Sequence, residues 1–149
     1  MVEGSIGGAA DSAPDAPRWP AIVAAVRGCV GTRFRSQGRR PGLGLDCVGV
    51  VLIAAAASGM GDVAVPAYFL GGDNAADVET LLLKAGCALV TAPELGDVLV
   101  IAPVPRQRHL AVVTPAGVVH AHAGLGRVVE GPLDPDWTLV GAWRLAGAR

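Results

Sequence analysis

The sequence predicts an α+β domain in which N-terminal helices precede a C-terminal antiparallel sheet of five strands. Apolar residues recur at helical spacing up to about residue 86, and they alternate with a period of two beyond Pro93. One helical stretch, residues 45–61, is apolar on every side, which is typical of a helix at the centre of a domain. We therefore expect this central buried helix to pack on the sheet.

Three helices are expected in the first half of the chain. Each is bounded by a residue type that starts a helix, such as Pro, Asp or Asn, and by Gly at its end. The Gly- and Arg-rich stretch between the first two helices is expected to be an irregular loop. The helices run from Trp19 to Gly28, from Asp46 to Gly59 and Gly61, and from Asp73 or Asn74 to Gly86, and residues 66–72 form a turn-rich link.

The second half contains short β-branched runs separated by turn residues. Pro-Ala-Gly, Gly-Leu-Gly and Asp-Pro stretches divide the runs, as in a chain of antiparallel strands. The five expected strands are residues 96–102, 109–114, 117–123, 126–130 and 138–145.

Length and composition indicate one domain without a disulfide framework. The chain has 149 residues, enough to bury a core, and its three cysteines are odd in number and widely spaced. Residues 1–17 are rich in Gly, Ala and Pro and are expected to be a flexible arm or a docking strand, with residues 18–149 as the domain. Apolar residues make up 52% of the chain, so we expect a partner or self-assembly to cover some of its surface.

Charge and hydropathy exclude several classes of function. A net charge of -1 argues against a protein built to bind nucleic acid or an anionic membrane. The longest apolar run, Val48 to Ala57, is too short to span a bilayer, which takes roughly 20 residues. The first residues lack the basic and apolar regions of a signal peptide, so we expect synthesis in the cytoplasm without secretion by the general route.

Cys47 is the first candidate for a catalytic nucleophile because it lies in the first turn of the buried helix. Unpaired N–H groups and the helix dipole at that position favour a thiolate, the reactive form of the side chain. Asp46 opposes the effect with its charge, although capping turns its carboxylate toward backbone donors. The alternative is a small core residue, which is the interpretation kept for Cys29 and Cys87.

Three histidines cluster on adjacent predicted strands. His109 opens one strand, and His120 and His122 share a face of the next. A nucleophile at a helix start, a base on a strand and an orienting group on the neighbouring strand form the triad arrangement of cysteine hydrolases. Structural histidines in a half-exposed sheet are the alternative.

Arginines surround this candidate site in the sequence. Four of them lie between residues 33 and 40, in the loop that precedes Cys47, and Arg106 and Arg108 precede His109. Their guanidinium groups could bind substrate carboxylates through paired hydrogen bonds. A solvated loop is the alternative for both groups.

These residues fall in an order that resembles the NlpC-type cell-wall cysteine peptidases. The closing stretch, VVEGPLDPDW followed by GAWRL, is especially similar to the branch carried by tailed phages and gene transfer agents, and the resemblance covers about residues 20–145. The motifs that carry it are Gly31, Thr32 and Phe34, then Leu45 to Gly49, then Gly96 to Leu99, then His109 to Val112, then Val119 to Ala121.

The resemblance implies a papain-like fold and a peptidoglycan endopeptidase. Cys47 would be the nucleophile, His109 the base and His120 the residue that orients the base, with no cofactor and no metal. Phe34, Arg35, Asp46 and His122 would form the substrate-binding or oxyanion neighbourhood. The implied substrates are stem peptides of bacterial peptidoglycan, often cut between D-glutamate and the diamino acid.

Two departures from the family pattern concern substrate binding. Many members have Tyr where this chain has Phe34, and Phe cannot donate a hydrogen bond to an oxyanion. Many also have Ser where this chain has Val48, and Trp-Gly-Gly in place of residues 36–38. The oxyanion hole is therefore expected to use the Cys47 N–H and another donor.

The resemblance also suggests how such an enzyme leaves its producer. We expect incorporation in a phage-like particle, at the tail tip or baseplate, with other tail proteins as partners and no membrane span; a lysis system is the other route. An inactive structural tail component with the same fold is one alternative function. A zinc site built from Cys47, His109, His120 and His122 is another.

Overall fold

The computed structural model describes residues 16–65 and 75–147, and it confirms a mixed α+β architecture. Helix α2 spans Trp19–Arg27, α3 spans Cys47–Ala57 and α4 spans Ala75–Lys84. These positions match the three expected helices. The expected arm, residues 1–17, lies almost wholly outside the described residues, as do the link 66–72 and the expected caps Asp73 and Asn74.

The larger sheet is antiparallel and has six strands in the order β3-β8-β4-β5-β6-β7. Strands β4 to β7 follow one another as a meander, whereas β8 returns to the far side of β4. The strands are β3 (Ala88–Val90), β4 (Val98–Ala102), β5 (His109–Thr114), β6 (Gly117–His122), β7 (Arg127–Gly131) and β8 (Thr138–Arg144).

The expected count of five strands is wrong, and so is the expectation of an irregular loop before Cys47. Strand β3 has only three residues, two of them exposed, so its pairing with β8 rather than an apolar pattern of its own defines it. The Arg-rich stretch folds into a two-stranded sheet of β1 (Arg39–Arg40) and β2 (Gly44–Leu45). Gly42, with φ of +81°, makes the turn between them.

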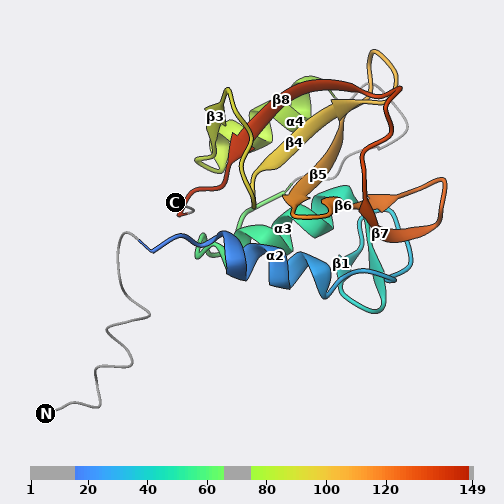
Figure 1. The fold of residues 1–149 in the computed structure, drawn as a ribbon, viewed down its shortest axis with the longest axis horizontal. Coiled ribbons are helices and arrows are strands. Elements are labelled where there is room, and N and C mark those ends of the chain that lie inside the picture. The colour runs from blue at the N-terminus through green and yellow to red at the C-terminus, as the bar shows by residue number, and fades with distance from the viewer. Residues whose placement is uncertain (1–15, 66–74, 148–149) are drawn as a thin grey trace, which may run out of the picture.

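The six-stranded sheet has a core on each face. On one face, α2 and α3 lie side by side against the strands (Figure 1). The alternation along β5 separates the two faces: Leu110 and Val112 join the helix-side core, whereas Ala111 joins a smaller core on the opposite face. That second core packs against the connection between β7 and β8, through Leu133 and Trp137.

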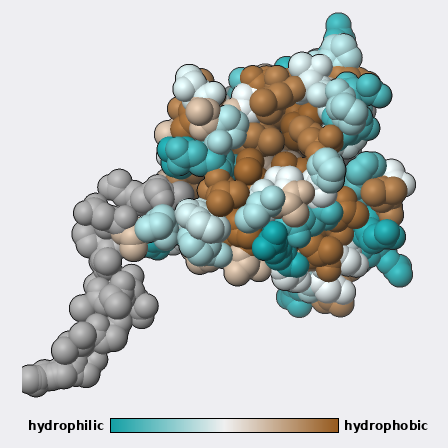
Figure 2. Space-filling view, in the orientation of Figure 1, coloured by the Kyte–Doolittle hydropathy of each residue, from teal (hydrophilic) through white to brown (hydrophobic). Residues whose placement is uncertain are grey.

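Helix α3 is buried because its sequence offers no polar face. Seven of its residues are buried, and all of them except Gly49 belong to one core together with residues of the sheet, α2 and α4. Among the described residues, no helix is both long enough and apolar enough to cross a membrane. Apolar side chains are nevertheless exposed on the face seen in Figure 2, in line with the apolar composition.

Candidate active site

The start of α3 is fixed by the carboxylate of Asp46. This side chain is fully buried and accepts hydrogen bonds from the N–H of Gly49 at 2.9 Å and of Gln37 at 2.7 Å. Arg39 adds an ion pair at 3.1 Å. Asp46 thus caps the helix as expected and also holds the preceding loop against the helix start.

The loop and the helix start are in very close contact. A Cβ atom added to Gly49 would collide with the carbonyl oxygen of Gly38, so glycine is required at this point of the helix. Gln37, beside it, has φ of +64°, a left-handed conformation that is uncommon for a residue with a Cβ. The loop therefore lies directly against the first turn of α3.

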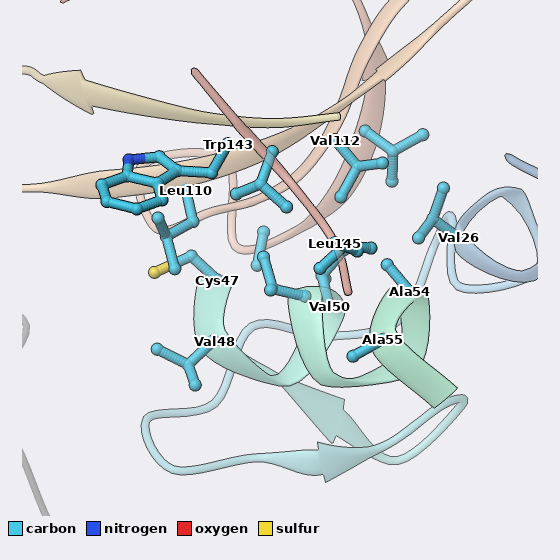
Figure 3. Close-up of a cluster of buried hydrophobic side chains, with 14 of the residues drawn as sticks. Val26, Cys47, Val48, Val50, Ala54, Ala55, Leu110, Val112, Trp143 and Leu145 are labelled. Atoms are coloured by element: carbon cyan, nitrogen blue, oxygen red, sulfur yellow. The ribbon is translucent and has the colours of Figure 1, made fainter. Parts of the chain in front are cut away.

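Cys47 is the first residue of α3 and is only 3% exposed. Figure 3 shows its sulfur at the end of the helix, next to Leu110. Burial raises the pKa of the thiol to about 12, and the charge of Asp46 raises it as well; N–H groups of Leu110, Val48 and Cys47 act in the opposite direction. Desolvation thus opposes the thiolate that the helix start favours, and it is the larger of the two effects.

The thiol lies where two strands of the sheet separate. Pairing between β5 and β6 runs from Thr114–Gly117 to Val112–Val119 and stops there. If it continued, Leu110 would be the next residue to bond to β6, but its N–H faces the Cys47 sulfur instead. The thiol is therefore adjacent to the peptide group that joins His109 to Leu110.

His109 and His120 form a direct hydrogen bond across the separated strands. The distance from Nε2 of His109 to Nδ1 of His120 is 2.7 Å, and the ring centroids are 4.9 Å apart. Because Nε2 contacts His120, Nδ1 is the nitrogen of His109 that remains for a thiol. A proton on Nε2 of His109 leaves Nδ1 as a base and requires His120 to accept through its own Nδ1.

Both imidazoles are held in the neutral form. Burial lowers the pKa of His109 to about 3, with smaller effects from His120 and His122. Burial also lowers the pKa of His120 to about 4, with a smaller effect from His122. The Cys47 thiol and the two imidazoles are therefore all neutral in the resting protein.

The other predicted site residues lie at different depths in the structure. Phe34 is partly buried, packs on the helix-side core and bridges to Leu45. Arg35 is exposed, and its side chain covers Gly44. The ring of His122 is 5.4 Å from that of His120, and its Nδ1 accepts a hydrogen bond from the N–H of Leu125 in the following turn.

A cavity of about 840 Å³ reaches Cys47 from the side of α4. Its apolar wall includes Val48, Val78 and Leu81, and two cationic residues, Lys84 and Arg108, also line it. The imidazoles are not part of this lining, so the thiol has the cavity on one side and the β5 main chain on another.

A comparison of the chain with protein-family models finds no match, and a comparison with curated proteins finds none either. Among residues 16–65 and 75–147, no group of three or more His, Cys, Asp or Glu side chains is placed to hold a metal ion.

Sequence reasoning missed Trp137 and the N–H of Leu110. The indole ring lies within 6 Å of three imidazole rings, at 5.4 Å from His109, 5.9 Å from His120 and 5.5 Å from His122. The sequence contained a signal for Trp137: the chain has three Trp residues, and this one follows an Asp-Pro-Asp turn next to the last predicted strand. The role of the Leu110 N–H depends on where the strands separate, which has no sequence signature.

Proposed function

We propose that the chain is a cysteine peptidase that hydrolyses stem peptides of bacterial peptidoglycan. The observation that carries the proposal is the position of the Cys47 thiol at a helix start, against the peptide group that joins His109 to Leu110. The 2.7 Å bond between His109 and His120 supplies an oriented base. A nucleophile, a base and an orienting group in this order define a hydrolase triad.

The proposed reaction starts from neutral groups. Nδ1 of His109 takes the thiol proton as the sulfur attacks the substrate carbonyl, and N–H groups at the start of α3 stabilise the oxyanion. The imidazolium then gives its proton to the leaving amine, which leaves an acyl thioester on Cys47. Water, deprotonated by His109, hydrolyses the thioester and restores the thiol.

His120 acts on the base rather than on the substrate. By accepting the Nε2 proton of His109, it selects the tautomer whose Nδ1 is free to take the thiol proton. It also stabilises the imidazolium, because the hydrogen bond persists after His109 is protonated.

The cavity next to Cys47 supports a peptide substrate that carries carboxylates. Arg108 and Lys84 line it together with apolar residues, a combination that suits the alkyl chain and the acidic groups of a stem peptide. The bond between D-glutamate and the diamino acid is the proposed site of cleavage, on the basis of the family resemblance. The same resemblance supports a papain-like fold and a place in a phage-like tail or baseplate.

The test is digestion of purified peptidoglycan sacculi followed by mass spectrometry of the released muropeptides. The parent protein should release cut stem peptides, whereas Cys47→Ala should release none. Cys87→Ala is the matched control, because Cys87 is also buried but lies far along the chain from the helix start. Equal digestion by the parent and Cys47→Ala would contradict the assignment.

One observation favours the alternative of an inactive structural tail component. A thiol with a pKa of about 12 is a poor nucleophile until a base removes its proton. Phe34 also lacks the hydroxyl that many family members carry at this position. If the parent protein releases no muropeptides but binds sacculi or tail proteins, this structural function replaces the peptidase.

A further inference from the structure

We propose that Trp137 is a positioning residue that covers the paired imidazoles of His109 and His120 and keeps both rings in their working orientation. The inference rests on the proposed peptidase function for its catalytic meaning. Its structural part, the control of the two rings by an indole, can be tested without any turnover.

The register of the sheet places Trp137 on the same face as His109. Ile101 pairs with His109 on one side and with Leu139 on the other, so these three residues form a row across β5, β4 and β8. Directly paired residues point to the same face of a sheet, and so do residues two apart along a strand. Trp137, two residues before Leu139, extends this row past the end of β8.

A short turn fixes the main chain at Trp137. The N–H of Asp136 donates to Oδ1 of Asp134 at 2.8 Å, and the N–H of Trp137 donates to the carbonyl oxygen of Asp134 at 3.1 Å. This Asx-type turn, with Pro135 in its middle, gives the indole little freedom to move away. The partly buried indole also packs on the second core.

The indole ring of Trp137 contacts both imidazole rings, that of His109 and that of His120. Trp137 meets His109 at an interplanar angle of 74° and His120 at 88°, both edge-to-face arrangements. Such contacts are specific in geometry and contribute about 0.5–1.5 kcal/mol each beyond simple burial. The indole therefore restricts rotation of the His109 ring, whose Nδ1 has to face the thiol while Nε2 stays bonded to His120.

The same cover excludes water from the imidazoles. Burial is the largest cause of the lowered pKa of both His109 and His120. The titratable groups that act on His109 are His120 and His122, so loss of the indole would change its hydration without removing a charged neighbour. Replacement of Trp137 by a smaller side chain should therefore raise both pKa values toward the ordinary value for histidine.

The experiment is an NMR titration of the histidine ring protons in the Cys47→Ala background, with and without Trp137→Leu. We expect the midpoints of His109 and His120 to rise by at least one pH unit in Trp137→Leu. Trp137→Phe, which keeps an aromatic cover, should shift them by less than half as much. Trp19→Leu is the matched control, because Trp19 lies beside Gly96 at the other end of the sheet.

Unchanged midpoints in a folded Trp137→Leu protein would overturn the inference and leave Trp137 a packing residue. Asp134→Ala, which removes the Asx turn but keeps the indole, is the second variant if Trp137→Leu does not fold, and it should shift the midpoints in the same direction. With an active parent protein, kcat for Trp137→Leu should fall about tenfold. An inactive parent would contradict the proposed function alone, since the titration does not depend on turnover.

Discussion

The candidate site joins two regions that are built by different kinds of interaction. The start of α3 depends on contacts between residues that are close in sequence. Asp46 and Gln37 are within ten residues of Cys47, and their hydrogen bonds fix the helix start. The imidazole region is non-local, because β5, β6 and the connection before β8 bring His109, His120 and Trp137 together. The Cys47 thiol is thus positioned by a helix cap, whereas the imidazoles are positioned by sheet register and ring packing.

This difference predicts different consequences of mutation in the two regions. Changes at the helix start should alter the reactivity of the thiol and the stability of α3. Changes among the rings should alter proton transfer and the response to pH. The following predictions, from the largest effect to the smallest, test whether the two regions separate in this way.

His109→Ala should reduce kcat for stem-peptide cleavage by about a thousandfold or more, because the variant lacks the group that takes the thiol proton in the proposed reaction. The far-UV circular dichroism of the variant should match that of the parent. The measurement is muropeptide release over time. Residual cleavage within tenfold of the parent would show that a different base serves Cys47.

Lowering the pH from 7 to 5 should reduce the free energy of unfolding by roughly 3 kcal/mol. In the folded protein the pKa of His109 is about 3 and that of His120 about 4, below the ordinary value of about 6.5 in the unfolded chain. Between these values the unfolded chain binds more protons, so stability is highest above about pH 6.5, begins to fall below that pH and goes on falling until the pH reaches the folded pKa values.

Urea denaturation at the two pH values measures this loss. A His109→Gln and His120→Gln double variant is the control, because it removes both titrating rings and should lose most of the pH dependence. A parent protein whose stability is the same at pH 7 and pH 5 would show that the imidazoles are not held neutral by burial.

His120→Ala should lower kcat about 10- to 100-fold, since His109 then loses the acceptor that selects its tautomer. His120→Gln offers an amide oxygen as a replacement acceptor and should retain more activity than His120→Ala. Initial rates on one purified stem peptide compare the two variants. Identical rates would indicate that the 2.7 Å bond does not orient the base.

Asp46→Asn should make Cys47 several-fold more reactive toward iodoacetamide near pH 8. The charge of Asp46 raises the pKa of the thiol, and Asn removes that charge while its side-chain oxygen still caps the helix. Peptide mass spectrometry gives the alkylation rate of Cys47, with Cys87 as the internal reference. Slower alkylation of Cys47 would mean that the effect of Asp46 on the thiol is structural rather than electrostatic.

The helix start was predictable from sequence, and the arrangement of the rings was only partly so. Asp46 as a cap and Cys47 in the first turn follow from local residue preferences, and the period of two placed His120 and His122 on one face. Burial of Cys47 was also visible in an all-apolar helix. The raised pKa of the thiol does not follow from the sequence, because the size of the desolvation depends on which residues pack around the thiol in the folded chain.

The remaining features depend on contacts between distant parts of the chain. Strand β3 exists because β8 pairs with it, and the pairing of β5 with β6 stops before Leu110, whose N–H bonds to Cys47 of α3 instead. Trp137 reaches the histidines through the register of three strands. None of these is encoded in a window of neighbouring residues, so periodicity and capping rules could not find them.

The contact between Gly38 and Gly49 has a practical consequence for engineering. Because the carbonyl of Gly38 occupies the space of a side chain on the helix, the loop and the first turn of α3 can be exchanged only together. A chimaera that imports a different loop would have to place its junctions before residue 38 and after residue 49. Junctions inside that interval would bring together two surfaces that were not shaped for each other.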